Sequence, residues 1–192
     1  MQVVRGLPKG RISEVPSAVA IGNFDGVHLG HLELVERAQS LADQLDGQSV
    51  VVTFEPLTRE FFAGDQAPAR LQSTGEKLMA LCASGVDVTW LLRFDEQMAA
   101  LEPETFLRSV LLHGLNVKHL IMGSDFRFGR GRTGSVAGLQ ELSRRLEFEV
   151  TALDHVIENE TRVSSTAIRR SLADGDFVNA AQLLGRPFRM MG

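Results

Sequence analysis

The feature that most constrains the fold is a regular alternation of short apolar runs with longer segments of helical periodicity. Five runs rich in aliphatic residues predict buried strands, namely Ala18–Ile21, Val50–Phe54, Val86–Leu92, Val117–Met122 and Phe148–Leu153. Segments with apolar residues at helical spacing lie between and after them, namely Leu32–Leu45, Lys77–Ala83, Glu104–Leu112, Val136–Leu146, Ser164–Leu172 and Phe177–Leu184. Strands joined by helical crossovers form mostly parallel sheets with helices on both faces. The sequence therefore predicts an α/β protein with a Rossmann-like, doubly wound sheet of five strands.

Local signals support several of these boundaries. Ser73 to Glu76 has the spacing of a capping box, which predicts a helix start there. Pro103 stands where the first turn of the next helix would begin. Pro56 to Arg70 contains turn residues and predicts a loop.

Charge and cysteine usage exclude several classes of protein. The 20 basic and 24 acidic side chains give a net charge of −4, which argues against a general nucleic-acid binder. A single cysteine, Cys82, excludes an internal disulfide and a cysteine-rich zinc site. No apolar run approaches the roughly 18 residues that span a membrane, and the first residues do not read as a signal peptide. We therefore expect a cytoplasmic protein without membrane or nucleic-acid partners.

The loop after the first strand, with the sequence GNFDGVHLGH from Gly22 to His31, carries the strongest signal for chemistry. It joins a strand to a helix, where free backbone N–H groups favour a phosphate. His28 and His31 are three residues apart, so they face the same way at the helix start and could clamp that phosphate. The alternative for paired histidines is zinc, which needs further ligands at suitable spacing. His113, His119 and His155 are scattered, so we expect structural roles for them and no protein metal site.

Two further segments could complete a site at the same edge of the sheet. Arg162–Arg169 places hydroxyl groups before a helix and an arginine on either side, which suits phosphate oxygens, although a capped surface helix would look the same. Gly123–Gly134 combines glycines, arginines, Phe126 and Phe128. Such a loop fits a flat ring in a small ligand, a single-stranded nucleic acid, or phenylalanines that only pack beneath the loop. Phe54 to Phe62 could be a lid or simply a connection.

These segments resemble the motifs of bacterial FAD synthetases, the N-terminal module of bifunctional riboflavin kinase/FMN adenylyltransferases. Gly22–His31 is similar to the HxGH motif of the nucleotidyltransferase superfamily in its GNFDGVHxGH form, and Val163–Arg169 is similar to the family's ISSTxIR signature. Gly123–Gly131 resembles its GxDFRFGxG loop. The resemblance covers essentially the whole chain.

The resemblance implies transfer of AMP from ATP to FMN, giving FAD and pyrophosphate, with Mg²⁺ accompanying ATP. It implies catalytic roles for Asn23, His28, His31 and Arg169. The ATP-binding residues it implies are Gly22, Phe24, Gly30, Arg162, Ser164, Ser165 and Thr166, and the FMN-binding residues are Phe62, Asp125, Phe126 and Phe128. It also predicts an adenylyltransferase domain over residues 1–186 and the start of a linker to a riboflavin kinase module over 187–192, with kinase activity only in a full-length protein.

The chain departs from the family pattern at Leu57 and Thr58, where the family often has a His-Pro pair. The change removes one imidazole from the rim of the expected nucleotide site. The alternative functions are those of another HxGH adenylyl- or cytidylyltransferase, a non-catalytic flavin-nucleotide binding module, and an RNA-binding protein.

Overall fold

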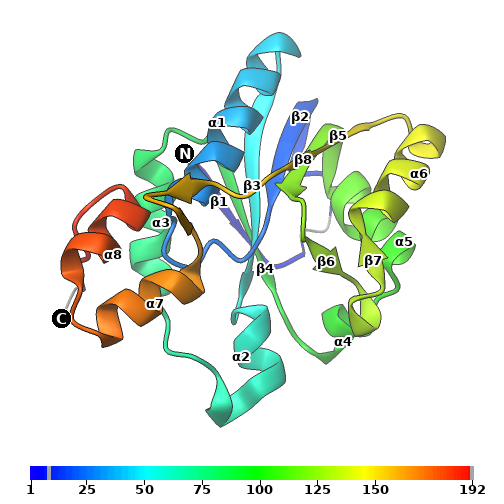
Figure 1. Ribbon diagram of the computed structural model, residues 1–192. Coiled ribbons are helices and arrows are strands. Elements are labelled where there is room, and N and C mark those ends of the chain that lie inside the picture. Colours follow the sequence, from blue (N-terminus) through cyan, green and yellow to red (C-terminus); the bar gives the residue numbers. More distant parts are fainter. Residues whose placement is uncertain (8–9, 191–192) are drawn as a thin grey trace.

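The computed structural model describes residues 1–7 and 10–190 and has a six-stranded parallel sheet at its centre (Figure 1). The strand order is β1-β4-β3-β2-β5-β8. The strands are β1 (Gln2–Arg5), β2 (Ser13–Ile21), β3 (Gln48–Glu55), β4 (Val88–Arg93), β5 (Leu115–Gly123) and β8 (Glu149–Leu153). The Rossmann-like α/β class is confirmed, but the prediction of five strands was wrong. The additional strand, β1, lies at the edge and has only four residues, none of them fully buried, so it lacks the apolar run that marks the others.

Helices cover both faces of this sheet. Successive side chains of a strand point to opposite faces, and in these strands both sets of side chains are mostly apolar. On one face, Ala18 and Ala20 of β2 pack against α1 (Leu29–Gln44) and α3 (Thr74–Ala83). On the other face, Val19 and Ile21 belong to a second core. That core includes residues of α4 (Glu96–Ala99), α5 (Pro103–Phe106), the π-helix η2 (Leu107–Leu112) and α6 (Val136–Leu146).

The carboxyl ends of the strands lie on one edge, and the shorter elements gather there. β3 pairs with β2 on one side, and β5 pairs with β2 on the other, so the strand order reverses beside β2. Ligands bind at such a point in doubly wound sheets. Nearby are α2 (Thr58–Ala63), the 3₁₀ turns η1 (Gly64–Gln66) and η3 (Arg130–Arg132), and the antiparallel pairs β6 (Arg127–Phe128) with β7 (Gly134–Ser135) and β9 (Ile157–Glu158) with β10 (Thr161–Arg162).

Two C-terminal helices, α7 (Ser165–Ala173) and α8 (Phe177–Leu184), pack together beside this edge (Figure 1). Their small apolar core includes Ile168 and Leu183, and Leu71 from the segment before α3 joins it. The two α-helices were correctly predicted. They bring the second motif, Arg162–Arg169, towards the first motif, Gly22–His31.

Two local predictions need correction. The segment Pro56–Arg70 is not a plain loop, because it contains α2 and η1. Neither element buries a residue, so neither has the apolar face that reveals a helix in sequence. The helix expected over Glu104–Leu112 is divided between α5 and η2. None of the helices within residues 1–7 and 10–190 is both long and apolar enough to cross a membrane.

Candidate active site at the carboxyl edge of the sheet

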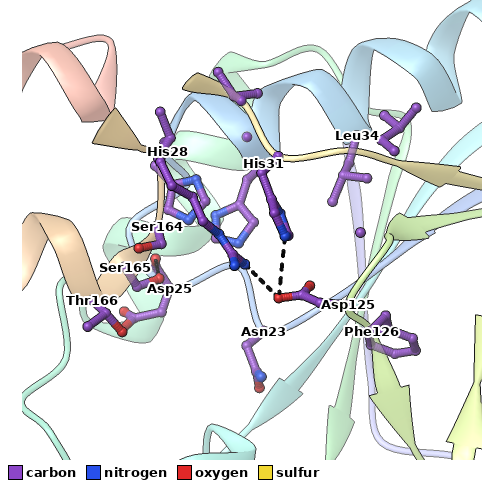
Figure 2. A pocket seen from close by; sticks show the side chains of 18 of the residues that line it. Asn23, Asp25, His28, His31, Leu34, Asp125, Phe126, Ser164, Ser165 and Thr166 are labelled. Atoms are coloured by element: carbon purple, nitrogen blue, oxygen red, sulfur yellow. Dashed lines mark hydrogen bonds and ion pairs between the residues drawn. The ribbon is translucent and has the colours of Figure 1, made fainter. Parts of the chain in front are cut away.

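Two adjoining cavities open at the carboxyl edge of the sheet. The first, here the histidine cavity, has a volume of about 280 Å³ and is lined by His28, His31 and the residues of the second motif (Figure 2). The second, here the aromatic cavity, has a volume of about 390 Å³ and is lined by phenylalanines, among them Phe54, Phe62 and Phe128. The two cavities share four lining residues, namely Asn23, Arg59, Pro68 and Phe126. A ligand with an anionic end and a flat ring could therefore extend from one into the other.

The first motif forms one wall of the histidine cavity. His28 is the N-cap residue of α1, and its ring stacks on that of His31 with centroids 3.7 Å apart and planes 14° apart. The tight path before them requires Gly26, whose φ is +90° and where a Cβ would lie 2.8 Å from the Leu71 side chain. The two imidazoles face the same way, as their spacing predicts.

Both rings carry an unsatisfied polar atom. Within the described residues, Nδ1 of His28 and Nδ1 of His31 are buried and have no hydrogen-bond partner. Buried polar atoms in folded proteins are usually hydrogen-bonded to protein or to water, so a ligand or a water molecule could satisfy these two. The pair can therefore offer hydrogen bonds to a ligand without first giving up bonds within the protein.

Burial keeps both rings neutral at pH 7. It lowers the pKa of His28 to about 4, and the Arg186 guanidinium acts in the same direction. Burial also lowers the pKa of His31 well below 6.5, helped by His28, Lys77 and Arg186. A neutral imidazole has one N–H donor and one acceptor. In the free protein the two rings therefore offer hydrogen-bonding groups but carry no positive charge.

We expect acid to destabilise the fold through these imidazoles. Between pH 6.5 and about 4, an unfolded chain protonates His28 whereas the folded protein does not. The free energy of unfolding should therefore fall as the pH drops through this window, by about 3 kcal/mol for this group alone. Urea unfolding of the protein and of a His28→Gln variant at pH 7.5 and 4.5 measures the effect. The variant should lose less stability on acidification, and equal losses would contradict the assignment.

The second motif forms the opposite wall, at the start of α7. Ser164 caps α7 by accepting a hydrogen bond from the Ala167 N–H (3.1 Å), and Ser165 donates one to the backbone carbonyl of Asp25 (2.8 Å). Thr166 also lines the cavity. Figure 2 shows the three hydroxyl residues gathered beside Asp25. The two motifs are thus joined directly by a hydrogen bond.

A buried ion pair makes the second connection between the motifs. The guanidinium of Arg169 pairs with Oδ2 of Asp25, whose other oxygen accepts the backbone N–H of Leu71 at 3.0 Å. Burial raises the pKa of the Asp25 carboxyl, whereas Arg169 and Lys77 lower it. The structure therefore gives Arg169 a carboxylate partner at the cavity wall, and its contact with a phosphate stays a prediction.

A second, exposed ion pair spans the mouth of the histidine cavity. Arg162 of β10 donates to Oδ2 of Asp125 at 2.6 Å, and Nε2 of His155 lies 3.9 Å from the same oxygen (Figure 2). Arg162 lowers the pKa of the Asp125 carboxyl despite its partial burial. His155 also lines the cavity, and the structural role expected for it stays a prediction. His119 is buried and bonds to Thr151 at 2.7 Å, which fits a structural role.

The structure brings together most of the predicted site residues. Those that line the histidine cavity are Gly22, Asn23, His28, Gly30, His31, Asp125, Phe126, Arg162, Ser164, Ser165, Thr166 and Arg169. Phe62, Phe126 and Phe128 line the aromatic cavity, but Asp125 does not. Phe24 lines neither cavity, and its implied role in ATP binding stays a prediction. It is fully buried, and its ring centroid lies 4.9 Å from that of His31.

Asn23 occupies the junction of the two cavities and is held from several sides. Its side-chain amide donates to Oγ1 of Thr58 (3.0 Å), and its Oδ1 accepts the Thr58 backbone N–H (3.2 Å). Its backbone carbonyl accepts from Oγ1 of Thr53 and from Nζ of Lys77. Thr58 thus ties α2 to the first motif at the position where the sequence departs from the family pattern.

Sequence reasoning missed several residues of the site. Arg59 lines both cavities, Lys77 is buried beneath the first motif, and Arg186 donates to the carbonyls of Gly26 and Val27. Arg59 and Lys77 stood in segments already singled out, but no role in the site was predicted for either of them. Among the residues that the structure describes, no group of three or more His, Cys, Asp or Glu side chains could hold a metal ion.

Comparison with known proteins gives consistent results. A family model described as FAD synthetase matches residues 11–167. The chain is 40% identical over 195 residues to the bifunctional riboflavin kinase/FMN adenylyltransferase of Escherichia coli strain K12 and 42% identical over 192 residues to that of Pseudomonas fluorescens. All of this chain is covered, but only 62% and 61% of the two relatives, so it spans less than two thirds of their length.

A solved structure also matches. It is described as a macrolide-efflux protein from Streptococcus pneumoniae and superimposes with a TM-score of 0.81 at 26% sequence identity. The match covers 97% of this chain and 63% of that one. Nearly the whole chain therefore shares its fold with an experimentally determined structure.

Proposed function

Because the chain belongs to the FAD synthetase family, we propose that it transfers AMP from ATP to the phosphate of FMN, releasing pyrophosphate and forming FAD. The observation that carries the proposal is the junction of the two cavities. One has buried, unsatisfied imidazoles facing hydroxyl groups, which suits phosphates, and the other has aromatic walls, which suits a flavin ring. Asn23, Arg59, Pro68 and Phe126 line both cavities, so the two sites adjoin.

The main task of the protein in this reaction is to position the two phosphate groups. An oxygen of the FMN phosphate attacks the α-phosphorus of ATP, the bond from that phosphorus to the bridging oxygen breaks, and pyrophosphate leaves. The attacking group is already an anion, so no general base or covalent intermediate is needed. The protein must align two anions and stabilise the charge on the α-phosphate and on the leaving group.

We assign the roles as follows. His28 and His31 donate hydrogen bonds to the reacting phosphates, and Asn23 donates to the α-phosphate region from the junction. The β- and γ-phosphates lie near the hydroxyl groups at the start of α7, with Arg169 and Arg162. Phe62, Phe126 and Phe128 contact the flavin ring, and Asp125 contacts the part of FMN that reaches the histidine cavity.

Mg²⁺ enters this scheme with ATP, where it would neutralise charge on the phosphates. The described residues include no group of three or more His, Cys, Asp or Glu side chains that could hold an ion, and Asp25 is paired with Arg169, so the phosphates and water would have to supply most of the ligands. Mg²⁺ in nucleotide sites commonly keeps several waters and takes few protein ligands. Asp125 and Asp154 also line the histidine cavity, and Asp125 is paired with Arg162 at 2.6 Å.

The extent of the module and its setting also stay predictions. We assign the riboflavin kinase activity in the relatives' name to the part of their length that this chain does not match. Arg186, which braces the first motif, is the last residue of the predicted domain. Of the predicted linker 187–192, residues 191–192 lie outside the described residues. A cytoplasmic location remains our expectation.

The test is a direct assay of the purified protein with ATP, Mg²⁺ and either FMN or riboflavin, followed by chromatography of the flavins. We expect FAD and one equivalent of pyrophosphate from FMN, and no FMN from riboflavin. Binding of FMN and ATP without pyrophosphate release would instead favour a non-catalytic binding module. Failure to bind FMN would favour a related transferase, which assays with pantetheine or nicotinate nucleotides would detect.

A further inference from the structure

The arginines that line the histidine cavity differ in whether they already have an ion-pair partner. Three arginines line the histidine cavity, namely Arg59, Arg162 and Arg169. Arg162 pairs with Asp125 at 2.6 Å, and Arg169 pairs with the buried Asp25. Within residues 1–7 and 10–190, the guanidinium of Arg59 forms no ion pair or hydrogen bond. Arg59 is therefore the cation of this cavity that can meet an anion without breaking a bond.

Although its side chain is exposed, the backbone of Arg59 is firmly placed. The residue before it, Thr58, bonds to Asn23 through both its backbone N–H and its hydroxyl. The residue after it, Glu60, accepts from the Leu57 N–H at 3.0 Å and pairs with Arg70, which also pairs with Glu55 at the end of β3. Fixing both neighbours keeps Arg59 at the junction, where it lines both cavities.

The aromatic cavity has a cationic lining as well. Arginines Arg59, Arg127 and Arg132 line it, and no aspartate or glutamate does. Arg127 and Arg132 come from β6 and η3, and neither lines the histidine cavity. Of these three arginines only Arg59 can therefore reach a group that lies between the ring site and the reacting phosphates.

We propose that Arg59 binds the phosphate of the flavin nucleotide and sets the preference for FMN over riboflavin. The inference rests on the proposed function and adds a catalytic residue that contacts the acceptor. A flavin ring in the aromatic cavity must direct its phosphate towards the histidine cavity to be adenylylated, and that path passes Arg59. A guanidinium donates two parallel hydrogen bonds to phosphate oxygens and remains charged at any physiological pH. Riboflavin, which has no phosphate, gains nothing from it.

The experiment is a titration of flavin fluorescence with FMN and with riboflavin, without ATP, on the wild-type protein and on Arg59→Ala. Loss of a charge-assisted hydrogen bond should weaken FMN binding by about 10- to 100-fold. Riboflavin binding should change by less than about twofold, because the ring contacts remain. Arg59→Lys should retain part of the preference, since lysine keeps the charge but loses the fork. Arg132→Ala, which removes a cation that lines the aromatic cavity but not the histidine cavity, is the matched control and should cost much less.

Several results would overturn the proposal. Equal weakening of FMN binding and riboflavin binding would show that Arg59 contacts the ring rather than the phosphate. Loss of the preference for FMN in Arg132→Ala alone would place the phosphate near Arg132 instead. An effect confined to ATP binding would assign Arg59 to the other substrate. The titration is separate from turnover, so a wild-type protein that prefers FMN yet makes no FAD would refute the proposed function. One that makes FAD with no change in Arg59→Ala would refute only this inference.

Discussion

Replacing His28 by alanine should lower the rate of FAD formation by about 10²- to 10³-fold, the usual cost of losing one preorganised donor to a developing charge. The fold should survive, because the ring contributes an unsatisfied Nδ1 to the interior and makes its principal contact with another imidazole. The loss should appear mainly in kcat, since the ring strengthens its hydrogen bonds as charge develops in the transition state. Steady-state assays of pyrophosphate release with FMN and ATP measure it.

His113→Ala is the matched control for this prediction. His113 follows the π-helix η2 and is not among the residues that line either cavity, so its replacement should leave the rate within about twofold. Thermal unfolding of both variants separates a catalytic loss from a folding defect. An unchanged kcat in a well-folded His28→Ala protein would remove the imidazole clamp from the mechanism.

Much of the fold could be predicted because its signals are local. Strands buried on both faces give apolar runs, as in Val50–Val52, and the capping box at Ser73 and Glu76 forms as its spacing predicts. The failures occurred where burial is slight. The edge strand β1 and the helix α2 have no fully buried residue, so the hydrophobic pattern of the sequence predicts neither of them.

The site was predictable only where its residues lie close together in the sequence. The stacked imidazoles follow from the three-residue spacing of His28 and His31 at a helix start. Lys77, in contrast, has a charged side chain that ordinarily predicts an exposed position. It is only 2% exposed, because three oxygens from the ends of β2 and β3 accept hydrogen bonds from its Nζ. Such a role depends on contacts between distant segments, which no local pattern encodes.

Replacing Asp25 by alanine should lower the free energy of unfolding by about 3–5 kcal/mol, the cost of leaving a buried charge without its partner. Side-chain exposure is 6% for Asp25 and 19% for Arg169, so water cannot fully replace the lost carboxylate. The backbone N–H of Leu71 would lose its acceptor as well. The comparison is Asp125→Ala, which breaks an ion pair with Arg162 whose side chains are 61% and 49% exposed. Exposed pairs contribute about 0–1 kcal/mol, so this variant should be nearly as stable as the wild-type protein.

Two further variants separate the charge from the hydrogen bonds in urea unfolding. Asp25→Asn keeps an acceptor for the Leu71 N–H and should therefore lose less stability than Asp25→Ala. Adding Arg169→Met to Asp25→Ala removes the stranded guanidinium and should recover part of the loss. Equal losses for Asp25→Ala and Asp125→Ala would contradict this account, as would a double variant no more stable than the single one. Because Asp25 joins the first motif to α7, its effect on stability would also measure how strongly the two walls of the histidine cavity are held together.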